Sequence, residues 1–347
     1  MLTPFEPPVG FSECPPCGGR LAQEPEDFQV DEVPLYPFCG EGEHLMVRLR
    51  KRDLTTQQMV RHVAQQAGVG AREIGVAGMK DKHAVTSQWL SLPARGARDP
   101  ESWQLPREIQ LLEVARHSNK LRTGHVRGNH FRIRLTGVRD VKAARAIAQA
   151  LGERGMPNYF GAQRFGVGLQ NLNEALAFLQ AKPGRKSQRF TDKLYPSVVQ
   201  AEIFNRYVAL RLEAGAEQLL PGEVVRLSGS SRVFLVTDPE REQPRLRDRD
   251  IFLTGPIWGP KMREAEHAAR ALELQSIAAL GLGEEVLQRL AKLVPGTRRD
   301  LLVFPEQFDL RAGEVPDELV VSFFLPAGSY ATEVLRQFTG DAFANVR

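Results

Sequence analysis

Cysteine is scarce in this sequence, which has only three, Cys14, Cys17 and Cys39, among its 347 residues. So few thiols exclude a framework of disulfide bonds. Cys14 and Cys17 have the C-x-x-C spacing of a redox pair or of half a zinc site, and Cys39 with His44 is a conceivable second half. Structural zinc usually takes two matched ligand pairs, and this sequence has no second matched pair. A redox pair needs a βαβ context, whereas Cys14 and Cys17 lie in a proline-rich N-terminal segment. We therefore expect ordinary thiols and no bound metal.

Long apolar runs are also missing. No stretch approaches the roughly 20 residues that a membrane-spanning helix needs. Residues 1–10 contain prolines and an acid, but no cationic region followed by an apolar stretch, so no secretion signal is expected. The chain is therefore predicted to reside in the cytoplasm, without contact to a membrane.

The common cofactor motifs are absent as well. The sequence has no G-x-G-x-x-G after a strand pattern, no G-x-x-x-x-G-K-[ST] and no H-E-x-x-H. The glycines of residues 160–168 have the wrong spacing for a dinucleotide loop. We expect no cofactor, and chemistry carried out by side chains alone.

The positive charge of the chain is small but unevenly distributed. The net charge is only +4. Residues 116–130 nevertheless carry four Lys or Arg and three of the seven histidines without any acid, and residues 182–193 carry five Lys or Arg against Asp192 alone. Such segments are an electrostatic footprint for phosphate backbones, although solvated surface loops remain the alternative.

Hydrophobic periodicity predicts strands and helices that are mixed without a repeat. Strand patterns occupy residues 43–50, 84–92, 109–115, 130–136 and 319–325. Helix patterns occupy residues 53–67, with Asp53 or Thr55 as cap, residues 140–154, and residues 330–338, with Ser329 as cap. Strands joined by irregular loops with helices laid against them indicate an α+β fold with a mainly antiparallel sheet.

The middle of the chain has a pattern of its own. It contains strand-like residues 223–227, 232–237 and 250–253, and helical residues 201–213, 260–280 and 284–293. This block is long enough to bury a separate core, and the strand and helix after it resemble a return to the first domain. We therefore predict a discontinuous domain of residues 1–157 and 305–347, with residues 158–304 inserted as a second α+β domain.

The most informative segment is residues 78–86, Gly-Met-Lys-Asp-Lys-His-Ala-Val-Thr. Asp81 stands between Lys80 and Lys82, just ahead of a strand pattern. The alternation of Val85 and Trp89 with Thr86 and Gln88 predicts that this strand has one buried face. An ionised Asp can serve as nucleophile or base, and the lysines could hold a polyanion over it. The alternative is an ordinary turn Asp with solvated lysines.

Five sequence blocks, taken together, closely resemble the signatures of the TruD family of tRNA pseudouridine synthases. The blocks are residues 25–32, 78–86, 128–131, 157–166 and 325–332. They occur in the order of the family and span nearly the whole chain. The resemblance implies a pseudouridine synthase catalytic domain interrupted by a family-specific insertion.

The resemblance also implies an activity and a set of site residues. The substrate would be a specific uridine in tRNA, position 13 in the bacterial members, isomerised to pseudouridine. Asp81 would be the catalytic nucleophile, acting on a flipped-out base. Phe28, Asn129 and Tyr330 match positions that line the target nucleotide, and Phe131 matches the place where other pseudouridine synthase families carry a tyrosine.

Two positions depart from the family pattern. Tyr330 stands where many members have Phe, which keeps a stacking ring and adds a hydroxyl. Ala22 stands where members tend to have a basic residue, and Arg20, two positions earlier, is the candidate to replace it if the segment is extended.

The chemistry of this reaction fits a chain without cofactors. The glycosidic C–N bond is broken and the uracil is rejoined through carbon, so no atoms are gained or lost. The aromatic residues could stack on the base or simply pack the core, and Asn129 could read the uracil edge or form a turn. A non-catalytic RNA-binding or assembly protein is the alternative function. We expect tRNA as partner and no obligate protein partner.

Overall fold

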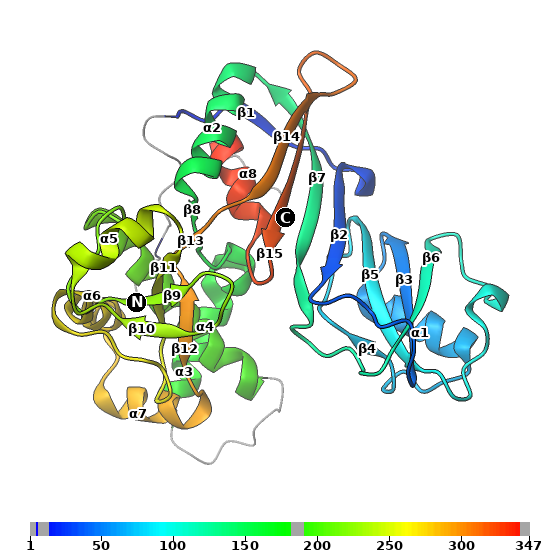
Figure 1. The fold of residues 1–347 in the computed structure, drawn as a ribbon, viewed down its shortest axis with the longest axis horizontal. Helices are drawn as coiled ribbons and strands as arrows, with labels where there is room; N and C mark the ends of the chain where they lie inside the picture. Colours follow the sequence, from blue (N-terminus) through cyan, green and yellow to red (C-terminus); the bar gives the residue numbers. More distant parts are fainter. Residues whose placement is uncertain (1–4, 6–13, 182–190, 341–347) are drawn as a thin grey trace. The chain divides into compact units, whose positions relative to one another are not determined.

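The computed structural model describes residue 5, residues 14–181 and residues 191–340. The chain forms two compact units. The first unit comprises Gly10–Arg154 and Phe304–Arg347, and the second unit comprises Met1–Val9 and Gly155–Val303. Each unit has its own sheet (Figure 1).

The first unit is built on a nine-stranded sheet with the order β14-β15-β7-β2-β5-β3-β6, where β1 also pairs with β7 and β4 with β5. Its strands are β1 (Gly18–Leu21), β2 (Phe28–Pro34), β3 (His44–Arg52), β4 (Gly75–Val76), β5 (Val85–Pro93), β6 (Ile109–His117), β7 (Val126–Val138), β14 (Glu306–Ala312) and β15 (Leu319–Pro326). All pairs are antiparallel except β2 with β5. The predicted α+β fold with a mainly antiparallel sheet is confirmed.

Strand β5 lies in the middle of this sheet, between β2 and β3. The expectation of a single buried face is wrong for this strand. Thr86 and Leu90 on one face and Ser87 and Trp89 on the other are all buried. A central strand that is covered on both sides loses the alternation that marks a half-exposed strand.

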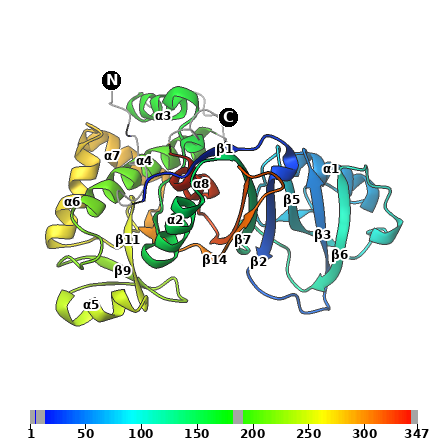
Figure 2. The same ribbon diagram turned by 90° about the horizontal axis from the view of Figure 1, so that it is seen from above.

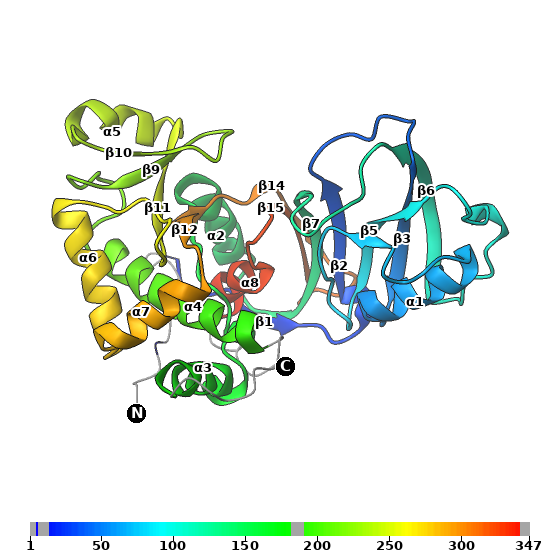
Figure 3. The same cartoon turned by 90° about the horizontal axis from the view of Figure 1, so that it is seen from below.

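Helix α1 (Thr56–Ala67) covers one face of the sheet over β3 and β5 (Figure 3). It begins after Thr55, whose hydroxyl accepts from the Gln58 backbone N–H while the Gln58 side chain accepts from the Thr55 N–H. This reciprocal capping box decides for Thr55 over Asp53 as the cap. The helix ends at Gly68, whose φ of 72° is favourable only for glycine.

Two further helices belong to the first unit, α2 (Val141–Arg154) and α8 (Ala331–Thr339). Helix α8 packs through Phe338 on Phe308 of β14, which in turn contacts Phe323 of β15. The residue that precedes α8 as its N-cap is Tyr330 rather than the expected Ser329, and its side chain makes no capping hydrogen bond.

The second unit contains a sheet with the order β10-β9-β11-β12 and a separate pair, β8 with β13. Its strands are β8 (Met156–Pro157), β9 (Val224–Leu227), β10 (Val233–Leu235), β11 (Ile251–Ile257), β12 (Thr297–Asp300) and β13 (Leu302–Val303). Its helices are α3 (Gln170–Gln180), α4 (Thr191–Glu213), α5 (Pro239–Arg247), α6 (His267–Ala278) and α7 (Glu284–Leu293). Helix α4 is central and contacts α3, α6 and α7 (Figure 2).

The core of the second unit forms where α4 meets the sheet. Phe204 and Tyr207 of α4 pack with Val225 of β9 and Leu253 of β11, and all four are buried. The helix expected over residues 260–280 is shorter than predicted, because α6 begins only at His267. In the part of the chain that the structure describes, no helix combines the length and apolar character that crossing a membrane requires.

Candidate active site

The strand register of the first unit brings three of the expected site residues onto one face of its sheet. Residues directly opposite each other in antiparallel strands point to the same side. Val30 of β2 is opposite Phe131 of β7, and Glu32 is opposite Asn129. Phe28 lies on the same face of β2 as Val30, because side chains alternate along a strand. Phe28, Phe131 and Asn129 therefore share a face.

The same face continues across β5 to β3, where it carries a buried lysine. Thr86 of β5 is the partner of Val30, and Lys51 of β3 is the partner of Thr86. Lys51 is fully buried, with 0% of its surface exposed. Its ammonium Nζ donates a hydrogen bond to the backbone carbonyl oxygen of Asp81 over 2.5 Å. This face of the sheet thus lies directly beneath the Asp81 segment.

The loop that carries Asp81 is held by a small polar network at the start of α1. The Lys80 backbone N–H donates to the Thr56 hydroxyl over 3.0 Å, and the Thr56 hydroxyl donates to Gln88 Oε1 over 2.9 Å. Gln88 Nε2 donates to the Gly78 carbonyl over 3.2 Å. Asp81 itself is exposed. An exposed carboxylate is therefore presented on a backbone that is fixed from below.

Glu32 connects this loop with the neighbourhood of Asn129. Lys80 Nζ and Glu32 Oε2 form an ion pair of 2.7 Å, with side-chain exposures of 8% and 1%. The other Glu32 oxygen, Oε1, accepts from the Trp89 backbone N–H. The expectation that Lys80 could hold a polyanion is wrong, because a buried carboxylate already neutralises it. Among the two lysines beside Asp81, only Lys82 is exposed.

The electrostatics of the site centre on Lys51. Burial lowers the pKa of the Lys51 ammonium to about 8; the negative charge of Asp81 opposes this shift, and the positive charge of Lys80 adds to it. Desolvation disfavours the charged form of an amine, whereas a nearby carboxylate favours it. Lys51 can consequently change its protonation state just above neutral pH.

The aromatic residues of this face form a packed cluster. The rings of Phe28 and Phe131 meet edge to face with centroids 6.1 Å apart, and Phe131 stacks on Phe323 at 5.4 Å. Phe28 and Phe131 are 4% and 8% exposed. Both side chains therefore contribute to the core of the first unit, which is the alternative role that the sequence left open for them.

Asn129 and Tyr330 differ from these rings in carrying polar groups. The Asn129 Oδ1 atom is buried and has no hydrogen-bond partner in the structure. Buried acceptors are normally satisfied, so an unpaired Oδ1 at this position is unusual. Leu325 of β15 is opposite Asn129, and Tyr330 follows a few residues later as the half-buried cap of α8.

Arg20, the candidate to replace the basic residue that Ala22 lacks, lies in β1. Arg20 of β1 is opposite Thr136 of β7. Thr136 belongs to the alternating set that includes Arg132 and Arg134, so Arg20 points away from the face that carries Asn129. The buried cation next to the Asp81 loop is Lys51 instead.

The cationic stretch of residues 116–130 is only partly a surface feature. His117 is buried and stacks on Tyr36 with ring centroids 5.1 Å apart, and His125 Nδ1 lies 2.8 Å from the Tyr36 hydroxyl. The footprint prediction is therefore wrong for these two histidines, whereas Arg116 and Arg122 are exposed. The second predicted stretch falls largely on residues 182–190, which lie outside the described residues.

The cysteines take different environments. Cys17 is buried and donates through its thiol to the Phe338 carbonyl oxygen, and burial raises its pKa to about 11. Cys39 is exposed and Cys14 is half-buried. Over the described ranges, no group of three or more His, Cys, Asp or Glu side chains is arranged to hold a metal ion.

Two functional candidates were missed by the sequence patterns, Lys51 and Glu32. A signal for Lys51 exists, since it continues the inward-facing series Leu45, Val47 and Leu49 of β3. A charged residue at the next inward position of a buried strand needs a partner or a function.

Comparison with known proteins shows the class of protein to which this chain belongs. The family described as tRNA pseudouridine synthase D (TruD) matches residues 9–175 and 185–338. A tRNA pseudouridine synthase D from Anaeromyxobacter sp. (strain Fw109-5) is 41% identical over 337 residues, which cover 95% of each chain. An enzyme of that name from Thermus thermophilus is 38% identical over 340 residues, covering 97% of this chain and 93% of the relative.

A solved structure agrees with these sequence matches. The crystal structure of a candidate tRNA pseudouridine synthase D from Methanosarcina mazei superimposes with a TM-score of 0.72 at 25% identity, covering 94% of each chain. The fold is thus that of a pseudouridine synthase. The chain belongs to the TruD family of tRNA pseudouridine synthases.

Proposed function

We propose that this chain isomerises a specific uridine of tRNA, at position 13, to pseudouridine, in the cytoplasm and with Asp81 as the nucleophile. The observation that carries the proposal is Asp81 itself, an exposed carboxylate on a loop whose backbone is fixed by Lys51 and by the network around Thr56. A nucleophile must meet its substrate in one geometry, and a supported loop provides it.

The reaction needs one carboxylate and no oxidant. The bond between uracil N1 and ribose C1′ breaks, and a bond between uracil C5 and C1′ forms. The proton on C5 leaves and a proton is gained at N1, so atoms and electrons balance within the substrate. Asp81 acts by attack on C1′, by attack on the base or by deprotonating the sugar; each route requires the ionised carboxylate.

The target base must leave its stack before Asp81 can reach it, which costs a few kcal/mol. Stacking in the site offsets this cost by about 1–3 kcal/mol per base. Tyr330, which is half-buried, is the proposed stacking surface, whereas the rings of Phe28 and Phe131 meet edge to face and are buried. Asn129 Oδ1, which lacks a partner, would accept the N3–H of uracil and so favour this base.

We assign the catalytic domain to residues 1–157 and 305–347 and the family-specific insertion to residues 158–304. Two observations support this assignment. The compact units change at Gly155 and Val303. The residues through which the chain enters and leaves the second unit also pair with each other, Met156 with Val303 and Pro157 with Leu302. An insertion whose ends lie side by side leaves the host domain undisturbed.

The test uses unmodified tRNA labelled with tritium at C5 of its uridines. The parent protein should release one equivalent of tritium per tRNA, without added metal or cofactor, and Asp81→Asn should release none. Tight tRNA binding without tritium release by the parent would favour a non-catalytic RNA-binding or assembly protein instead.

A further inference from the structure

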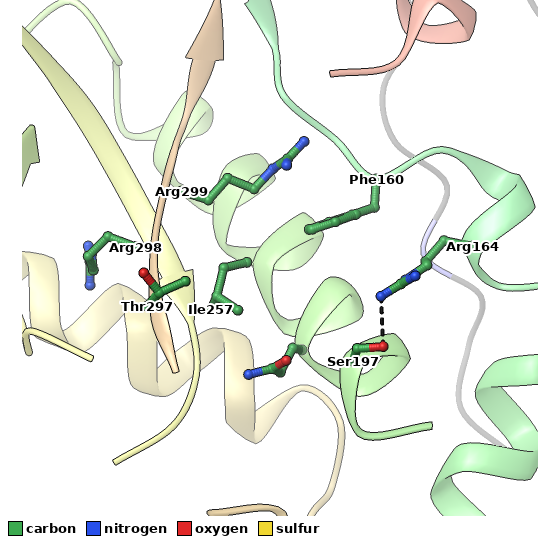
Figure 4. A pocket seen from close by; sticks show the side chains of 8 residues that line it. Phe160, Arg164, Ser197, Ile257, Thr297, Arg298 and Arg299 are labelled. Atoms are coloured by element: carbon green, nitrogen blue, oxygen red, sulfur yellow. Dashed lines mark hydrogen bonds between the residues drawn. The ribbon is translucent and has the colours of Figure 1, made fainter. Parts of the chain in front are cut away.

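The second unit contains a pocket of about 290 Å³ that the proposed chemistry does not use (Figure 4). Its lining comes from the segment after β8, from α4 and from the facing strands β11 and β12. The lining residues are Phe160, Arg164, Ser197, Gln200, Ile257, Thr297, Arg298 and Arg299. This volume lies at the lower end of the range for small-molecule sites.

The pocket wall formed by Phe160 is held rigidly. The Phe160 backbone N–H donates to Asn205 Oδ1 over 2.8 Å, and Asn205 Nδ2 donates to the Phe160 carbonyl over 3.0 Å. Nearby, Asn158 Nδ2 donates to the Asp300 carbonyl of β12. Both asparagines are buried. The backbone of Phe160 is therefore fixed in place before any ligand arrives, which reduces the entropy lost on binding.

The charge of the pocket is positive. Neither Asp nor Glu occurs among its lining residues. Arg298 points away from Phe160 and pairs with the buried Glu273 at 2.5 Å (Figure 4). Arg299 points toward Phe160, with its Cζ atom 4.2 Å from the ring centroid, and its guanidinium donates to the backbone carbonyl and Oδ1 of Asn158. Arg164 lies on the other side of the opening, with its Cζ atom 6.0 Å from the same centroid.

Arg164 is incompletely satisfied in this position. Its Nη2 atom donates to the Ser197 hydroxyl over 2.7 Å, a neutral partner. Its Nε atom is buried and has no hydrogen-bond partner in the structure. A partly buried guanidinium without its full set of acceptors is costly, and the cost is removed by an anion that accepts from it.

The side chains that line the pocket offer groups that can bind a phosphate and groups that can bind a base. Arginine presents a planar fork of donors that fits phosphate oxygens, and the hydroxyls of Ser197 and Thr297 are further donors. The guanidinium plane of Arg299, which lies over the Phe160 ring, offers with that ring a stacking surface for a base. We propose that this pocket binds one nucleotide of the RNA strand, with its phosphate on Arg164 and its base against Phe160 and the guanidinium of Arg299. This proposal rests on RNA being the substrate, as inferred above.

The first test measures tRNA binding at several salt concentrations, with turnover recorded separately. Arg164→Gln should weaken binding about tenfold and reduce the salt slope by about 1, because one phosphate contact is lost. At saturating tRNA the turnover rate should stay at the parent value, so the effect appears in KM and not in kcat. Arg247→Gln, the same change on an exposed arginine of α5 outside the lining, is the control and should bind like the parent.

The second test needs no substitution and remains decisive if Arg164→Gln fails to fold. The parent protein is treated with phenylglyoxal, and modification of Arg164 is followed by mass spectrometry. Unmodified tRNA should protect Arg164, and millimolar uridine 5′-monophosphate should not. Protection by micromolar uridine 5′-monophosphate would show that the pocket binds a free nucleotide and not the RNA strand, and it would overturn the proposal.

Two outcomes separate this proposal from the proposed function. An unprotected Arg164, or an Arg164→Gln variant that binds tRNA with the affinity and salt slope of Arg247→Gln, would reject the pocket while leaving Asp81 untouched. Conversely, protection of Arg164 by tRNA in a protein that releases no tritium would reject the catalytic role of Asp81 and retain the pocket.

Discussion

The ammonium of Lys51, buried in the sheet of the first unit, donates a hydrogen bond to the backbone carbonyl of Asp81 over 2.5 Å. The contact joins β3 to a loop that precedes β5, so it depends on the pairing of these two strands. It places a positive charge under the backbone of the proposed nucleophile.

Replacing Asp81 by Asn keeps nearly the same volume and removes the negative charge. We expect tRNA binding equal to that of the parent or slightly tighter, and no detectable pseudouridine, because an amide is too weak a nucleophile or base. The matched control is Asp31→Asn. Asp31 pairs with Ser87 and Arg48 on the opposite face of β2 from Glu32, so this variant should retain measurable turnover. Comparable rates for Asp81→Asn and the parent would refute the mechanism.

Lys51 should make the stability of the fold depend on pH. The pKa in the folded state, about 8, is below the ordinary value of 10.5, so burial disfavours the charged form. This unfavourable contribution is fully present below pH 8 and disappears as the pH rises to 10.5. The free energy of unfolding of the parent, relative to Lys51→Met, should therefore increase by up to about 3 kcal/mol between pH 7 and pH 10.5.

Urea denaturation of both proteins across this pH range measures the difference directly. Other titrating groups affect parent and variant alike and cancel in the comparison. A difference that stays constant with pH would show that Lys51 keeps an ordinary pKa in the folded protein.

Substitution of Asn129 should lower activity without lowering the stability of the fold. Asn129→Leu removes the buried Oδ1 acceptor that has no hydrogen-bond partner and substitutes an apolar side chain of similar size. We expect a melting temperature equal to or above that of the parent, because no satisfied hydrogen bond of Oδ1 is lost. The value of kcat/KM should fall roughly 10- to 100-fold, as expected for the loss of a hydrogen bond to the uracil edge. A parallel loss of stability and activity would indicate a structural role alone.

The ion pair between Lys80 and Glu32 should be necessary for the position of the Asp81 loop. Glu32→Gln leaves the Lys80 charge buried without its carboxylate, which costs about 3–5 kcal/mol of stability. The double variant Glu32→Leu with Lys80→Met removes both charges and should recover most of this stability, as seen by denaturant unfolding. Its turnover should stay low, because the loop has lost an anchor. Full activity in a stable double variant would rule out this anchoring role.

Local sequence patterns determined much of the secondary structure. The strand predicted over residues 43–50 is β3, which begins one residue later and ends two residues later, and the helix predicted over residues 284–293 has the bounds of α7. Both have strong periodicity and clear end signals, which act within a few residues. Helix α5 was not predicted, because it carries Pro239 at its start and Pro244 inside, and prolines usually indicate a loop.

The sequence also determined the family, since five blocks in order specify it without any contact being known. What it could not determine is which charged residues at inward positions stay buried. Glu32 and Lys51 occupy inward positions of β2 and β3, but their charges break the apolar pattern, so periodicity alone does not show that either is buried. Their burial is stable only because Glu32 meets Lys80 and Lys51 meets the Asp81 carbonyl, partners that strand pairing supplies from distant parts of the chain. Periodicity is a local property, whereas register and ion pairing are decided when the whole sheet assembles.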